Sequence, residues 1–104
     1  MREELELVRT TLLAAGEPES ASLVTAALAG DDAQMRAFLV SNELWGGSGS
    51  IANQAEARVS RDILRCDIAA ALADLGESQT RAGVTHLRTA GWVEIFRSWT
   101  RDGI

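Results

Sequence analysis

The chain has 104 residues, which is enough for one domain with a single hydrophobic core. Its net charge is −5 and every basic side chain is an arginine, so long-range attraction to nucleic acid or to an anionic membrane surface is disfavoured. One cysteine rules out an internal disulfide, the charged N-terminus is unlike a signal peptide, and no apolar stretch approaches the roughly twenty residues of a membrane span, so we expect a cytoplasmic protein.

Two amphipathic helices are predicted at the start of the chain. Over residues 2–15, apolar residues recur every three to four positions and acidic residues occupy the first turn, where the helix dipole favours them. Gly16 is a suitable C-terminal cap. A second helix is expected over 18–29, because Pro18 suits the first turn, where its missing N–H is not needed.

A third helix is predicted after Asp31, which forms a capping-box pattern with Gln34 and precedes an apolar run. The helical pattern then stops near Ser41, and a glycine-rich loop is expected over 42–50. Three glycines follow Trp45 within four residues. Glycine opens backbone conformations that other residues avoid, so a binding site on a loop is first sought here.

The second half of the chain predicts a short helix over 51–57 and a long one over about 60–81, which ends at Gly83. The long helix has two adjacent apolar faces, as expected of a central helix packed by several neighbours. A last helix is expected over 87–99. We predict an all-α fold: one domain, 1–104, forming a compact bundle of five to six helices around the long central helix.

The glycine-rich loop has two open interpretations. It is either a plain connection between two helical halves, with Trp45 filling the core, or a contact site for a partner or ligand. In the second case four side chains are the candidates: Asn42, Glu43, Trp45 and Ser48. A small-ligand binder or a small enzyme at this loop is therefore one alternative function.

The sequence contains few residues suited to catalysis or to metal binding. A phosphate-binding loop needs a lysine, and the chain has none. Residues 46–50 differ from a nucleophile elbow at the fifth position, and His86 is the only candidate base, so a Ser48/His86 hydrolase has weak support. Cys66 and His86 alone make no zinc set, and a buried, inert thiol is expected at Cys66. We predict no catalytic residues, no metal and no cofactor.

A helix-turn-helix over residues 51–65 is a second alternative. A short helix would be followed by one that opens near Ser60, with Arg58, Arg61 and Arg65 facing DNA. The usual turn glycine is missing, the turn is about two residues too long, and the acidic net charge opposes binding to phosphates. Nucleic acid is therefore not the partner we favour.

The last helix carries a one-sided stripe in which Trp92, Ile95, Phe96 and Trp99 fall at i, i+3, i+4 and i+7, beside Arg97. The stripe either fills the core or forms an interface, because tryptophan and arginine dominate protein interfaces. We predict a small non-catalytic interaction protein, a homodimer, that binds a protein partner or itself. Its contacts are expected at Trp92, Arg97 and Trp99, or at the Trp45 loop.

Overall fold

The computed structural model describes residues 1–61 and 66–101, with the side chains of residues 1–57 and 67–99. Within these ranges the chain is mostly helical and contains no strand. In chain order the elements are α1 (Arg2–Ala14), α2 (Pro18–Ala29), α3 (Asp32–Leu39), α4 (Asn42–Trp45), α5 (Ile51–Arg61), α6 (Cys66–Ala82) and α7 (Thr89–Arg101). The predicted all-α fold is confirmed.

The predicted helix ends of the first half form as expected. Gly16 has a φ of 76°, the left-handed conformation that closes α1. Pro18 occupies the first position of α2. The Asp31 carboxylate accepts from the Gln34 N–H at 2.8 Å, and the Gln34 side chain accepts from the Asp31 N–H at 2.8 Å, which completes the capping box of α3.

Part of the expected loop is helical. Residues 42–45 form α4, whose first turn is capped where the Ser41 hydroxyl accepts from the Leu44 N–H at 3.3 Å. Leu44 and Trp45 are both completely buried, so tertiary packing fixes a turn too short for a periodic pattern. The connecting loop is therefore reduced to residues 46–50.

The expected helix break before Ser60 is also absent, because α5 continues without interruption from Ile51 to Arg61. None of the residues from 57 to 60 is a glycine or a proline that would stop the helix. The start of the long helix, predicted near 60, falls partly on residues 62–65, which lie outside the described residues. From Cys66 the helix runs to Ala82.

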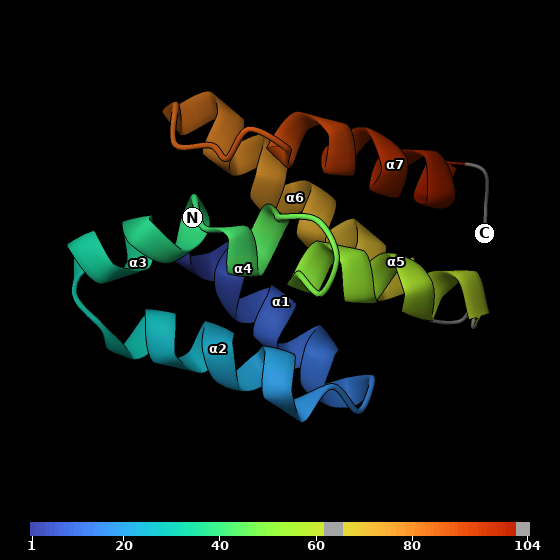
Figure 1. Ribbon diagram of the computed structural model, residues 1–104, viewed down its shortest axis with the longest axis horizontal. Helices are drawn as coiled ribbons and strands as arrows, with labels where there is room; N and C mark the ends of the chain where they lie inside the picture. The colour runs from blue at the N-terminus through green and yellow to red at the C-terminus, as the bar shows by residue number, and fades with distance from the viewer. Residues whose placement is uncertain (62–65, 102–104) are drawn as a thin grey trace.

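The centre of the bundle is α6, which packs against α1, α5 and α7 (Figure 1). Helix α2 packs on the other side of α1, so α2 and α7 lie at opposite edges of the molecule. The predicted central position of the long helix is confirmed. None of the helices within the described ranges has the length and apolar character needed to cross a membrane.

One buried amide connects three parts of the core. Gln79 of α6 is completely buried, and its Oε1 accepts from the Trp45 indole N–H at 3.0 Å. Its Nε2 donates to the carbonyl oxygens of Leu39 and Val84, each at 2.8 Å. The amide thus connects three parts of the chain: α4, the end of α3, and the segment after α6. It also satisfies polar groups that would otherwise be buried without partners.

Gly76 sets the approach of α7 to α6. A Cβ atom at this position would collide with Cγ2 of Val93 and would contact Thr89 and Trp45. Valine is branched at Cβ and has few rotamers with which to move away. The glycine that weakens a helix by about 1 kcal/mol relative to alanine is therefore required for close packing of the α6–α7 pair.

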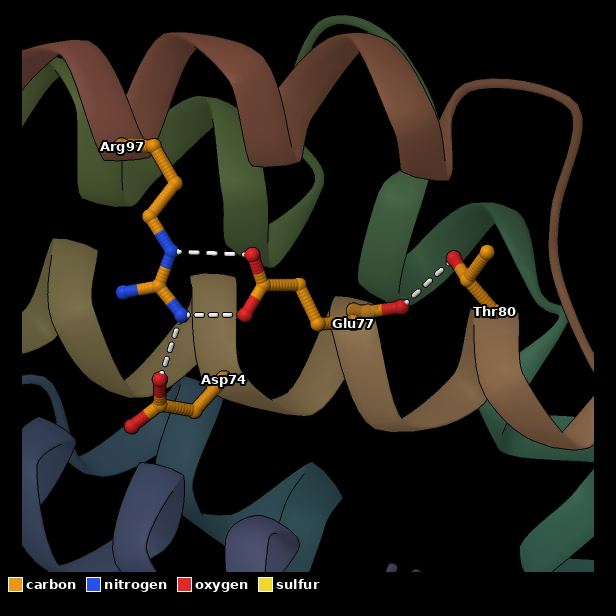
Figure 2. A network of polar contacts seen from close by, with 5 residues as sticks. Asp74, Glu77, Thr80 and Arg97 are labelled. Carbon is orange, nitrogen blue, oxygen red and sulfur yellow. Dashed lines mark hydrogen bonds and ion pairs between the residues drawn. The ribbon is translucent and has the colours of Figure 1, made fainter.

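Arg97 of α7 joins two carboxylates of α6 (Figure 2). Its Nε and Nη2 donate to the two oxygens of Glu77 at 3.1 and 2.5 Å, and Nη2 also donates to Asp74 at 2.6 Å. The hydrogen bonds from Arg97 lower the pKa of the Glu77 carboxyl below its ordinary value, and those carboxylates raise the pKa of Arg97. This bidentate cluster fixes the orientation of α7.

We predict that Gln79→Met destabilises the fold by about 3 kcal/mol, because one indole N–H and two carbonyl groups lose their buried partners. Leu75→Met, one turn earlier and equally buried, is the matched control and is expected to cost less than about 1.5 kcal/mol. Urea unfolding of both variants measures the difference. Equal losses in the two variants would show that the buried amide is not a special requirement of the core.

We also predict that the contribution of Glu77 disappears in acid. The pKa of Glu77 is lowered by folding, so its stabilisation is present above the ordinary value of 4.5 and is lost as the pH falls through the lower folded value. Because the cluster is partly solvent-exposed, Glu77→Gln should cost about 0.5–1 kcal/mol at neutral pH.

The measurement is the stability difference between wild type and Glu77→Gln, taken by urea unfolding across the acid range. The N-terminal ammonium also lowers the pKa of Glu4, so wild-type stability alone would mix two acid losses. Glu6→Gln, at an exposed position of α1, is the control. A wild-type advantage over Glu77→Gln that persists unchanged far below pH 4.5 would contradict the assignment.

Candidate functional site

The outer side of α7 leaves large apolar side chains uncovered. Leu87 is 95% exposed, the highest value among the large apolar residues that the structure describes, and Ile95 is 37% exposed. An open depression is lined by Leu87, Arg88, Gly91, Trp92 and Ile95. These five residues are called the α7 face below. In Figure 1, α7 lies along one edge of the molecule, with α6 beneath it.

Helical spacing explains why these residues share a face. Gly91 and Ile95 are four positions apart in α7, and Leu87 lies in the hydrogen-bonded turn that leads into this helix; all three line the same depression. Phe96, on the opposite side, is completely buried. The predicted stripe thus divides, with Phe96 in the core and Ile95 on the surface.

Trp92 fixes the α7 face to the rest of the bundle. Its indole N–H donates to the carbonyl oxygens of Trp45, at 3.0 Å, and Gly46, at 3.3 Å. Its ring stacks on Phe96 with the centroids 5.6 Å apart. The polar edge of Trp92 is therefore satisfied inside the protein, while the side chain remains only partly buried and borders the depression.

The segment before α7 is also held in place. His86 Nδ1 accepts from the Arg88 N–H at 2.9 Å, so the remaining hydrogen lies on Nε2, which donates to Oδ1 of Asn42 at 2.7 Å. The Thr89 hydroxyl accepts from the His86 N–H at 2.9 Å and ties this segment to the first residue of α7. Leu87 thus projects from a segment whose backbone is anchored on both sides.

Gly91 has no role inside the chain that requires a glycine. It lies in α7 on the exposed side, and a Cβ atom there would meet no atom within 4 Å. A glycine within a helix costs about 1 kcal/mol relative to alanine. At Gly76 close packing against α7 accounts for this cost, whereas at Gly91 nothing within the described chain does.

Charges flank the apolar part of the α7 face. Arg88 lies three residues before Gly91 and Glu94 lies three residues after it. Both side chains are exposed. Arg88 belongs to the α7 face, Glu94 lies outside its five residues, and the two are equally far from Gly91 along the sequence.

The other exposed leucines are less exposed than Leu87. Leu7 and Leu13 of α1 are 47% and 52% exposed, and Leu23 of α2 is 40% exposed. Single apolar side chains of this kind are normal on protein surfaces. Leu23 also borders a depression, with Phe38, whereas Leu87 is almost wholly exposed and borders one with Trp92 and Ile95.

The structure separates the predicted contact residues of the last helix. Trp92 belongs to the α7 face. Trp99 is partly buried and packs against the core cluster. Arg97 is joined to Asp74 and Glu77, so its role in the structure is to fix α7 on α6.

The predicted loop residues are likewise dispersed. Trp45 is completely buried, so it fills the core, which is one of the two roles that the sequence leaves open. Asn42 is bonded to His86. Glu43 is exposed and borders a different depression, which it shares with Leu23 and other residues of α2 and α3. Ser48 is exposed on the loop.

Side chains of α5 close the glycine-rich loop. The Gly49 N–H donates to Asn53, at 3.2 Å, and the Gly49 carbonyl oxygen accepts from Gln54, at 2.8 Å. The Ser50 hydroxyl donates to the Gly46 carbonyl oxygen at 2.9 Å and accepts from the Asn53 N–H at 3.0 Å. These backbone groups are engaged within the protein, which favours the connecting role of the loop.

The described residues give little support to a hydrolase that uses His86 or to a metal site. Both ring nitrogens of His86 are bonded, to Asn42 and to the Arg88 N–H. Within residues 1–61 and 66–101, no three histidine, cysteine or acidic residues are grouped to hold a metal ion. The side chains of Arg58, Arg61, Arg65 and Cys66 lie outside the described residues.

Sequence reasoning missed Leu87, Arg88 and Gly91. The signal available was the four-residue spacing of Leu87, Gly91 and Ile95, which marks a second side of the last helix. The tryptophan stripe masked it, because both sets share the same segment. Only the burial of Phe96 shows which side faces the core.

No known protein family matches this chain, and no curated protein or solved structure is detectably similar to it. The candidate site is therefore defined by this chain's own residues, among which Leu87 is the most exposed large apolar side chain described.

Proposed function

We propose that this protein is a small, non-catalytic, cytoplasmic interaction protein that self-associates and binds protein through the α7 face. The observation that carries the proposal is the exposure of Leu87, at 95%, beside the partly exposed Trp92 and Ile95. Transfer of such apolar side chains out of water is favourable, and association with another protein surface achieves this transfer.

Two further features support a contact surface for protein. Trp92 is held rigidly by hydrogen bonds and stacking, so little conformational entropy is lost when a partner covers it. Arg88 and Glu94 provide exposed charges at the rim, where interfaces are usually polar. A rigid aromatic residue in an apolar centre with a charged rim is the usual composition of a protein interface.

The two alternatives from the sequence have weaker support. The helix-turn-helix interpretation needs a turn near residues 57–60, where α5 is continuous. The ligand interpretation of the glycine-rich loop needs free polar groups, whereas the carbonyl of Gly46 and both backbone groups of Gly49 are bonded to other parts of the protein. No specific observation favours either alternative over protein binding.

We predict that the average mass of the wild-type protein rises with concentration. Leu87→Ser should weaken this association at least tenfold, because the exposed leucine of each copy loses its apolar contact with the other copy. The measurement is sedimentation velocity from about 10 µM to about 1 mM. Leu13→Ser is the matched control, since Leu13 is 52% exposed on α1, away from the α7 face.

Urea unfolding at low concentration establishes that both variants fold. A wild-type protein that remains monomeric throughout this range would overturn the proposal. So would an equal loss of association in Leu13→Ser, because the contact would then not depend on the α7 face.

A further inference from the structure

We propose that the partner on the α7 face is a second copy of this chain, with the two α7 helices antiparallel and the two-fold axis at Gly91. This inference rests on the proposed function and specifies its partner and geometry. Three features carry it: a glycine unexplained within the chain, apolar residues spaced equally on either side, and opposite charges placed in the same way.

Gly91 gives the position of the axis. Nothing within the described chain requires a glycine there, since a Cβ atom would meet no atom within 4 Å. At a two-fold axis the same residue of both copies meets itself. A residue without a side chain lets two helix backbones approach closely, as Gly76 already does between α6 and α7.

The apolar residues match across this axis. In an antiparallel pair, a residue at a given distance before the axis lies level with the residue at the same distance after it in the other copy. Leu87, in the turn that leads into α7, is four residues before Gly91, and Ile95 is four residues after it; all three line one depression. Each exposed leucine would therefore be covered by an isoleucine of the second copy, and the arrangement would occur twice.

The charges match in the same register. Arg88 is three residues before Gly91 and Glu94 is three residues after it. The guanidinium of one copy thus lies level with the carboxylate of the other, again twice. A parallel pair on the same face would bring Arg88 beside Arg88 and Glu94 beside Glu94, which is repulsive. Charge complementarity therefore selects the antiparallel second copy over the parallel one.

The size of the α7 face determines how tightly two copies are expected to bind. The α7 face has five residues, far fewer than the roughly 20–30 that each partner contributes to a standard stable interface. The dimer is therefore expected to dissociate in the micromolar range or weaker. The decisive comparison is accordingly between variants measured at the same concentrations.

The test is a charge exchange measured by sedimentation velocity. Arg88→Glu alone and Glu94→Arg alone should each weaken the dimer about tenfold or more, because each puts like charges level with one another twice per dimer. The double variant, with both substitutions, restores opposite charges and should recover the wild-type dissociation constant within about threefold. Recovery of this kind requires that the two residues face each other between copies.

Gly91→Ala provides a second variant with opposite effects on folding and association. In the monomer the added methyl group has open space, and alanine favours the helix, so resistance to urea at low concentration should rise. In the dimer the two methyl groups meet at the axis, and association should weaken about tenfold. Ile95→Ser should weaken the dimer as Leu87→Ser does.

The outcomes separate this geometry from the proposed function. If Leu87→Ser abolishes association but the double charge variant stays as weak as the single ones, the face is an interface and the antiparallel register is wrong. An unchanged dimer in Gly91→Ala would also overturn the register. If wild-type protein does not associate at all, both the register and the proposed function fail.

Discussion

The fold depends on the burial of one neutral polar side chain, Gln79, with all its hydrogen-bonding groups engaged. Its amide accepts from Trp45 and donates to two backbone carbonyls, so an indole and these two carbonyls can be buried together without loss of hydrogen bonds. The Trp45 carbonyl in turn accepts from Trp92 of α7. A line of polar contacts thus runs from the centre of the core to the α7 face.

The two sides of α7 illustrate opposite uses of the same residue types. On the inner side, Gly76 of α6 allows Val93 to approach closely, and Phe96 is fully buried. On the outer side, Gly91 and Leu87 have no such neighbours within the described chain. A helix with apolar residues on both sides is typical of a position between two packed elements. In the proposed dimer, the second copy supplies the other element.

Much of the fold could be predicted from local chemistry. Pro18, the Asp31 capping box and the glycines that end helices act within a few residues, so their effects are readable from sequence. The α4 turn and the length of α5 could not be predicted, because burial of Leu44 and Trp45 and the absence of a helix stop after Ala57 outweigh the local pattern. Of the residues in the candidate site, only Trp92 was among the contact residues predicted from the sequence. Its neighbours Leu87 and Gly91 became visible once the burial of Phe96 oriented the helix.

The support of α7 has a consequence for its dynamics. Within the described chain this helix packs chiefly on α6 and is held there by Phe96, by the Trp92 indole and by a solvent-exposed arginine cluster. Elements attached along one side tend to open before the whole domain unfolds. A molecule bound to the free side would favour the closed form by mass action, so occupancy of the surface and amide hydrogen-exchange protection of the helix are thermodynamically linked.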